Sequence, residues 1–303
     1  MVKNPSKIGN KLKRAEVYQK FKQQKSALKK KVRAERVKTL EELGEDAPPK
    51  ETPKTLENTR VKEETMMTVT DEEEIAGDEA DDEFAGYFAG DKKAKIMITT
   101  RPKCSKKLFD FIADLMQLIP NAFYYPRGEQ IVADMARKAE SKGFTHLVVL
   151  GEKNKLCNGM LITHLPKGPT CFYKISNYEA SSDLKGHGRP TSHSPEIILN
   201  NFGTRLGRRT GRVLSSIFPT EPQLEGRQVV TFHNQRDFIF VRHHRYIYRK
   251  EKEKLRARLQ ELGPRFTMKL KWLQEGTFNT EFGEYEWYHK RGQMDVTKRK
   301  FHM

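Results

Sequence analysis

Charge divides this sequence into three blocks, and only the third has the apolar periodicity that a folded core requires. Residues 1–40 hold 14 Lys and Arg against two acidic residues, whereas residues 41–92 hold 18 acidic against five basic residues. Residues 93–303 hold 38 basic and 20 acidic residues. Dense like charge with few apolar residues cannot bury enough surface to offset chain entropy. We therefore expect a basic N-terminal arm at 1–40, an acidic disordered linker at 41–92, and folded structure from residue 93.

Each charged block allows a second interpretation. Residues 25–40 lack Gly and Pro, so the arm can become helical on RNA, or it can be a solvated tail that carries a nuclear import signal. The acidic runs at 71–74 and 81–83 are expected to be solvated, which is the more common behaviour of such runs. They can alternatively fold back on a basic surface and imitate nucleic acid electrostatically.

The overall charge indicates a polyanionic partner. The formal charge is +17 and the isoelectric point is about 9.6, and Lys and Arg bind nucleic acid chiefly by neutralising phosphates. The sequence has no long apolar run and no apolar segment near its start, so we expect neither a membrane span nor a secretory signal. The spacing of its three cysteines fits neither a metal site nor a disulfide framework, which indicates a reducing compartment.

Sequence signatures of catalysis are absent. The chain has no P-loop, no G-x-S-x-G nucleophile elbow and no H-E-x-x-H motif. His243 and His244 are neighbours on an expected strand, so they point to opposite faces and cannot bind one metal ion together. We therefore expect no enzyme activity, no cofactor, no metal site and no small-molecule substrate.

The third block predicts a mixed α/β fold made of two units. In the first unit, apolar runs predict strands at 95–101, 123–125, 144–150, 157–165 and 170–175. Helical spacing predicts one helix that begins after Ser105 and ends before Pro120, and another at 128–142. After a polar loop, the second unit is expected to begin with a strand at 196–200 and a helix after Gly203. A hairpin at 228–248 follows, with its turn at 234–235. The unit is expected to end with a short helix lined by Leu255, Leu259 and Leu262 and an alternating strand at 265–272.

The segment 201–219 is the first candidate for an RNA-binding surface. On a helix with about 100° per residue, one face carries the apolar residues Leu206, Val213, Leu214 and Ile217. The opposite flank carries four arginines: Arg205, Arg208, Arg209 and Arg212. Guanidinium groups bind phosphates in bidentate fashion and stack on bases, so we expect this face to bind an RNA backbone. An ordinary basic helix face is the alternative.

Two further basic surfaces are expected on strands. In residues 236–248, aromatic side chains alternate with arginines, a pattern that can stack unpaired bases while it binds phosphates. We assign RNA contact there to Arg242 and Arg245, and we expect the start of this strand to be core. In residues 265–272, apolar positions alternate with an outer face that includes Lys269 and Lys271.

Three segments, in the right order, resemble the Brix family. They are the strand at 96–101 with its following helix and the sequence Pro-Asn-Ala-Phe-Tyr at 120–124, the segment 201–219, and Gly-Pro-Arg at 263–265 followed by an alternating strand. The resemblance covers about residues 93–273, although residues 250–261 depart from the family pattern.

The Brix resemblance implies an α/β fold of two pseudo-symmetric halves, about 93–175 and 195–273. Each half would resemble the anticodon-binding domain of class II aminoacyl-tRNA synthetases, with extended tails on either side. It implies work in the nucleolus on precursor RNA of the large ribosomal subunit, together with other assembly factors and ribosomal proteins. It also implies that the family's basic motif lies on the four arginines of 201–219.

A protein-docking adaptor in a small-subunit processome particle, with only incidental RNA contact, is the alternative function. The C-terminal tail at 274–303 suits docking because aromatic side chains anchor protein interfaces. The candidate docking residues are Phe282, Tyr285, Trp287 and Tyr288. Within the family, residues 276–287 resemble the ending of a large-subunit factor, so the choice of subunit depends on resemblance rather than on physical argument.

Overall fold

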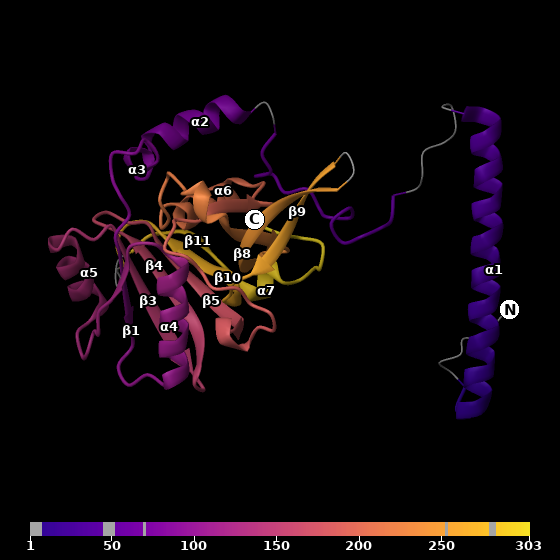
Figure 1. The fold of residues 1–303 in the computed structure, drawn as a ribbon, viewed down its shortest axis with the longest axis horizontal. Coiled ribbons are helices and arrows are strands. Elements are labelled where there is room, and N and C mark those ends of the chain that lie inside the picture. Colours follow the sequence, from indigo (N-terminus) through magenta and orange to yellow (C-terminus); the bar gives the residue numbers. More distant parts are fainter. Residues whose placement is uncertain (1–7, 45–51, 69–70, 252–253, 279–282) are drawn as a thin grey trace. The chain divides into compact units, whose positions relative to one another are not determined.

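A computed structural model describes residues 8–44, 52–68, 71–251, 254–278 and 283–303 (Figure 1). The chain divides into two compact units, residues 1–55 and residues 56–303. Each unit is described by itself.

The first unit is built on one long helix, α1 (Lys11–Leu43). Asn10 caps its start by accepting hydrogen bonds from the backbone N–H groups of Leu12 and Lys13, at 3.0 and 3.2 Å. Gly44 ends it with a positive φ of 56°, a conformation that suits glycine. The large apolar side chains of α1 are spread around the helix and exposed, so α1 has no apolar face. The expected basic arm is therefore helical from Lys11 onward in this structure.

A mixed sheet forms the centre of the second unit, and among the described residues it has 11 strands. The strands are β1 (Ile96–Thr100), β2 (Ala122–Tyr124), β3 (His146–Lys153), β4 (Leu156–His164), β5 (Thr170–Glu179), β6 (Glu196–Asn200), β7 (Gln228–Gln235), β8 (Phe238–Glu251), β9 (Lys254–Glu261), β10 (Arg265–Gln274) and β11 (Tyr285–Tyr288). Their order is β2-β1-β3-β4-β5-β10-β8-β7-β6, with β11 paired to β10 and β9 paired to β8.

Helices lie on both faces of this sheet. The helices of residues 56–303 are α2 (Glu72–Asp81), α3 (Ala85–Phe88), α4 (Lys106–Leu118), α5 (Val132–Ser141), α6 (Arg205–Ser215) and α7 (Arg291–Met294), with single 3-10 turns at Ser181–Asp183 and Leu224–Gly226. One apolar cluster joins the inner faces of α4 and α6 and the residues around α3 to one face of the sheet. A smaller cluster joins α5 to the opposite face at β1 and β3.

The two halves of the sheet repeat one topology. In the first half β1 pairs in parallel with β3, which continues through antiparallel pairs into β4 and β5. In the second half β6 pairs in parallel with β7, which continues through antiparallel pairs into β8 and β10. The helix that follows the first strand is α4 in one half and α6 in the other. Antiparallel pairing of β5 with β10 joins the halves, which agrees with the expected pseudo-symmetry. The relation to anticodon-binding domains stays a prediction.

Strand periodicity explains why β1 contributes side chains to both apolar clusters. Ile96 and Ile98 lie in the larger cluster, whereas Met97 between them lies with Met135 and Ala139 of α5 in the smaller one. Successive side chains on a strand point to opposite faces, so a run without polar residues marks a strand that is covered on both sides. Strands β1 to β5 confirm the strand predictions made for residues 95–175.

Two predictions made for residues 195–273 are wrong. The turn of the β7–β8 hairpin lies at Arg236 and Asp237 rather than at 234–235, and both residues have a positive φ, of 55° and 62°. The short helix expected through Leu255 and Leu259 is strand β9, which pairs along β8 from Glu261 to Lys254. Together β8 and β9 form a two-stranded ribbon that extends beyond the rest of the sheet (Figure 1).

Candidate nucleic-acid interface

Helix α6 divides its residues between a buried and a polar face, as its sequence predicts. Thr204 caps the helix by accepting a hydrogen bond from the N–H of Gly207 at 2.9 Å. Val213 and Leu214 are fully buried in the main apolar cluster. The four arginines project away from that cluster, toward the segment that contains α2.

The inner end of the arginine face is held by two carboxylates of α2 and its C-terminal flank. Two guanidinium nitrogens of Arg212 donate to Asp82 at 2.5 and 2.6 Å, and the third lies 3.3 Å from a carboxylate oxygen of Glu79. The Arg212 guanidinium also lies 4.5 Å from the ring centroid of Phe88. Only 16% of the Arg212 side chain is exposed. Charge-assisted bidentate bonds in a half-buried site are among the stronger polar contacts in proteins.

Arg209 links the acidic block to the C-terminal tail. It donates to Glu83 at 2.7 and 2.9 Å and to Glu286 of β11 at 3.1 Å. Burial disfavours the charged form of Arg209, but the hydrogen bonds to the two glutamates outweigh burial and raise the pKa of Arg209. The hydrogen bond from Arg209 lowers the pKa of Glu83 in turn.

The outer end of the arginine face is more open. Arg208 lies 3.3 Å from Glu79, and Arg205 lies 2.8 Å from Glu74. The exposed fraction of the arginine side chains rises from 23% at Arg209 to 45% at Arg208 and 57% at Arg205. Exposed single ion pairs of this kind are weak and salt-sensitive.

The arginine face of α6 is therefore paired with carboxylates of the chain itself, and RNA binding by this face stays a prediction. The prediction that all of 41–92 is disordered is wrong. Residues 72–81 and 85–88 form α2 and α3, and the acidic block is folded back on the basic surface, the alternative that the sequence left open. The carboxylates that sequence reasoning missed are Glu74, Glu79, Asp82, Glu83 and Glu286. A signal was present, because several acidic residues of 74–83 are four residues apart and share one helix face.

Apolar residues and backbone bonds anchor the acidic block on both sides of α2. On the C-terminal side Phe84 and Tyr87 are buried in the main cluster, and the Tyr87 hydroxyl donates to the carbonyl of Phe218. On the N-terminal side the N–H of Met67 donates to the carbonyl of Gly203 at 3.1 Å. These contacts hold α2 beside the start and the middle of α6.

The arginines of β8 have fewer and longer contacts with carboxylates than the arginines of α6. Arg242 lies 3.9 Å from Glu261, and burial lowers the pKa of Arg242. Arg245 and Arg249, farther along β8, are exposed and have no carboxylate partner among the residues that the structure describes. Register places Arg245 and Arg249 on one face of the ribbon, and Tyr248 on the other.

The predicted lysines of β10 are covered by the C-terminal tail. Lys269 lies 3.4 Å from Asp295 and 5.0 Å from the ring centroid of Phe238. Lys271 lies 3.2 Å from Nδ1 of His289, and burial lowers the pKa of Lys271. These two lysines are therefore less available to a phosphate backbone than the alternation of their strand predicts.

The candidate docking residues of the tail are divided between two environments. Tyr285 and Tyr288 are 50% and 51% exposed, and Tyr285 packs against Trp272 at 5.7 Å between ring centroids. Trp287 is half-buried against the main cluster instead. Phe282 lies outside the described residues. The tail thus pairs with β10 and leaves two tyrosines exposed.

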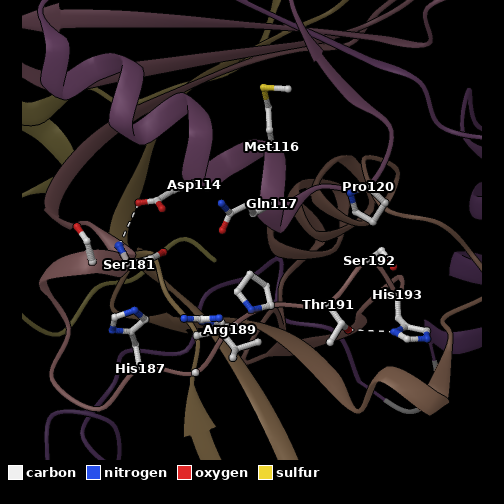
Figure 2. Close-up of a pocket in the computed structure, with 14 residues that line it drawn as sticks. Asp114, Met116, Gln117, Pro120, Ser181, His187, Arg189, Thr191, Ser192 and His193 are labelled. Atoms are coloured by element: carbon white, nitrogen blue, oxygen red, sulfur yellow. Dashed lines mark hydrogen bonds between the residues drawn. The ribbon is translucent and has the colours of Figure 1, made fainter.

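A polar groove of about 690 Å³ lies between α4 and the loop at 181–193 (Figure 2). The carboxylate of Asp114 in its wall accepts hydrogen bonds from the Tyr178 hydroxyl at 2.8 Å and from the N–H of Ser181 at 3.1 Å. Asp114 is the one carboxylate among the residues that line the groove. The groove therefore offers no paired carboxylates for acid–base chemistry.

Comparison with known proteins identifies the fold family. Residues 101–272, more than half of the chain, match the Brix domain. The chain belongs to the Brix family. This Brix protein is 47% identical to ribosome production factor 1 of Pongo abelii, over 98% of this chain and 84% of the relative. It is 41% identical to ribosome production factor 1 of Saccharomyces cerevisiae, over 99% of both chains.

One solved structure is similar to this chain at a lower level. It is titled as a "probable ribosomal biogenesis protein" from Aeropyrum pernix K1, with 16% identity and a TM-score of 0.44 over 58% of this Brix protein and 96% of that chain. In the described part of this Brix protein, no helix is both long and apolar enough to span a membrane. The same residues contain no cluster of three His, Cys, Asp or Glu side chains arranged to hold a metal ion.

Proposed function

We propose that this Brix protein is a non-enzymatic assembly factor of the large ribosomal subunit that binds precursor rRNA in the nucleolus. Family membership and the names of its relatives indicate ribosome biogenesis. Other assembly factors and ribosomal proteins would be its protein partners. The RNA-binding part of the proposal depends on which cations are free to meet phosphates.

The β8–β9 ribbon is the observation that carries the RNA-binding proposal. Its guanidinium groups at Arg245 and Arg249 lie on one exposed face of β8. Arg245 lies opposite Gln228, where β8 still pairs with β7, and Arg249 lies on the part of the ribbon that extends beyond β7. Tyr248 on the opposite face is 63% exposed and packs against Tyr246 at 5.4 Å between ring centroids. Exposed guanidinium groups on one face suit phosphate neutralisation, and an exposed aromatic ring on the other face suits stacking on an unpaired base.

Helix α1 adds a second basic element to this function. It has 12 Lys and Arg against four Glu over Lys11–Leu43. Its lack of an apolar face means that it does not need to pack on a protein core to remain soluble. A helix of this kind suits non-specific attraction to a phosphate backbone, whereas the ribbon suits recognition of RNA shape.

The RNA-binding proposal is tested by filter binding of the full chain to structured large-subunit rRNA over a salt series. The variant Arg245→Ala with Arg249→Ala should bind about tenfold more weakly at low salt, because it neutralises fewer phosphates. The slope of log affinity against log salt should become shallower by about two. The matched control is Lys106→Ala with Lys107→Ala, which removes the same charge from exposed positions on α4.

Two results would contradict the RNA-binding proposal. An affinity that does not change with salt would remove phosphate neutralisation as its basis. Equal weakening by the ribbon variant and the α4 control would show that the ribbon has no special role.

Protein docking is the second candidate function, and the exposed pair Tyr285 and Tyr288 favours it. The rings are 5.7 Å apart between centroids and lie beside Trp272 on the surface of the sheet. Exposed aromatic clusters are typical anchors of protein interfaces. The variant Tyr285→Ala with Tyr288→Ala should keep its RNA affinity and lose association with a pre-ribosomal protein if docking is the principal role.

A further inference from the structure

The contact between α2 and α6 is ionic to an unusual degree. Of the α2 side chains that the structure describes, Ile75 is the one buried apolar residue. In the rest of the contact, guanidiniums meet carboxylates and the main-chain carbonyl of Glu79, to which Arg212 donates at 2.9 Å. An open pocket of about 240 Å³, lined by Met67, Ile75 and the charged side chains, lies at this contact. Because little apolar surface is buried, few dispersion contacts oppose separation of the two helices.

The acidic block is nevertheless tethered at both ends of α2. The N–H of Met67 is bonded to Gly203 before α2, and Phe84 and Tyr87 are buried after it. A tethered ligand has a high effective concentration at its site, so weak individual ion pairs can keep the site occupied. Release of the carboxylates therefore does not require the anchors to unfold.

Exposure along the arginine face shows where another anion can enter. Arg212, at the inner end, has 16% of its side chain exposed, whereas Arg205, at the outer end, has 57%. Glu74, the partner of Arg205, is 62% exposed. An approaching anion can therefore compete for Arg205 first, and proceed inward as the carboxylates are displaced.

We propose that α2 is an internal anionic ligand of the arginine face of α6, and that an RNA backbone occupies this face by displacing the α2 carboxylates. Phosphate and carboxylate oxygens accept the same bidentate bonds from guanidinium, so the two ligands are interchangeable at these positions. RNA as the competitor rests on the proposed function. RNA that binds the arginines less strongly than the α2 carboxylates do therefore does not displace them.

This competition has two measurable consequences. The apparent affinity is the intrinsic affinity reduced by the fraction of molecules whose arginine face is open. In addition, each phosphate that pairs with an arginine releases a carboxylate, which takes up a cation from solution again. The net release of ions is therefore small while α2 is acidic, and it becomes large when α2 is neutral.

The experiment compares RNA binding by the full chain and by the variant Glu74→Gln, Glu79→Gln, Asp82→Asn, Glu83→Gln. The neutralised variant should bind about tenfold more tightly, with a salt slope steeper by about three for the four arginines. Asn at position 82 keeps an oxygen that can accept the bond that Asp82 now accepts from the N–H of Phe84 at 2.9 Å. The Tm of each variant shows that it is folded.

A matched control removes four other exposed carboxylates: Glu129→Gln, Glu140→Gln, Glu221→Gln, Glu225→Gln. It changes the net charge by the same amount without touching the arginine face. A gain in affinity and slope that is equal in the control and in the α2 variant would overturn the proposal, because net charge alone would then explain it.

Hydrogen exchange provides a direct readout of displacement. Amides of α2 should exchange faster when RNA or inorganic polyphosphate is added, whereas a ligand that binds elsewhere leaves their exchange unchanged. Unchanged exchange in α2 with bound RNA would overturn the displacement proposal and leave the RNA-binding function intact. If RNA binds none of the proteins, the function is contradicted, and the polyphosphate measurement still decides whether α2 can be displaced.

Discussion

At the scale of single residues, a buried histidine, His146, and a half-buried one, His164, lie at the junction of the sheet and α6. Nε2 of His146 lies 3.1 Å from Nδ1 of His164 and 3.0 Å from Oγ of Ser216. Burial, followed by the neighbouring His164, lowers the pKa of His146 well below its ordinary value. Burial also lowers the pKa of His164 to about 4. Both rings are therefore neutral near pH 7 in the folded chain.

The free energy of unfolding should fall as the pH is lowered from about 6.5 toward 4. Unfolded histidines take up protons in this range and the folded ones do not, so protons favour the unfolded state. Each such histidine contributes up to about 1.4 kcal/mol per pH unit. Urea titrations at several pH values should show a shallower fall for His164→Asn than for the native chain. An identical fall would mean that His164 titrates normally when folded.

At the scale of elements, Asp237 in the turn between β7 and β8 has two roles: it adopts the backbone conformation of the turn, and its carboxylate binds the C-terminal tail. Arg236 and Asp237 both have a positive φ, as in the two-residue turns that match strand twist. The Asp237 carboxylate also accepts bonds from the N–H groups of His302 and Met303, each at 2.9 Å. The turn residue therefore holds the end of the C-terminal tail.

Substitutions at this turn should have opposite effects. Arg236→Asn should stabilise the fold by up to about 1 kcal/mol, because Asn tolerates a positive φ better than Arg. Asp237→Gly should destabilise it by about 1–3 kcal/mol, because the buried N–H groups of His302 and Met303 lose their acceptor. Urea unfolding measures both changes. A stabilised Asp237→Gly variant would show that the tail contact contributes little.

The misassigned strand β9 shows why periodicity alone failed at one element. Leu255 and Leu259 are four residues apart, and a spacing of four fits both a helix face and a strand face. Pairing with β8 decided the outcome, because Leu259 lies opposite Tyr246 and Ala257 lies opposite Tyr248. Cross-strand partners that are nine and 13 residues apart do not appear in a pattern of neighbouring residues.

At the scale of the whole molecule, α1 and the Brix body should be separable. Deletion of residues 1–55 should leave the Tm within about 2 °C, because these residues form a compact unit of their own and α1 has no apolar face. The same deletion should make the salt dependence of RNA affinity shallower by about three or more, since 12 cations of α1 are lost. Calorimetry and filter binding measure the two effects. A large drop in Tm would show that α1 stabilises the body.

The local pattern was sufficient for the fold class and for most strands and helices of residues 93–303. Period-two alternation and helical spacing depend on neighbours within one element, so they can be recognised from the sequence without the tertiary structure. The division of α6 into Val213 and Leu214 on one face and four arginines on the other follows in the same way. The family resemblance was likewise carried by short segments in a fixed order.

Only the tertiary structure decided what the arginine face of α6 contacts. Arg209 and Glu83 are 126 positions apart, and Arg212 and Asp82 are 130 apart, so no local window contains both partners. The sequence by itself determined that opposite charges exist in separate blocks. Whether they meet depends on the burial of Phe84 and Tyr87, which brings the acidic block to α6 and turns a solvated charge run into an internal ligand.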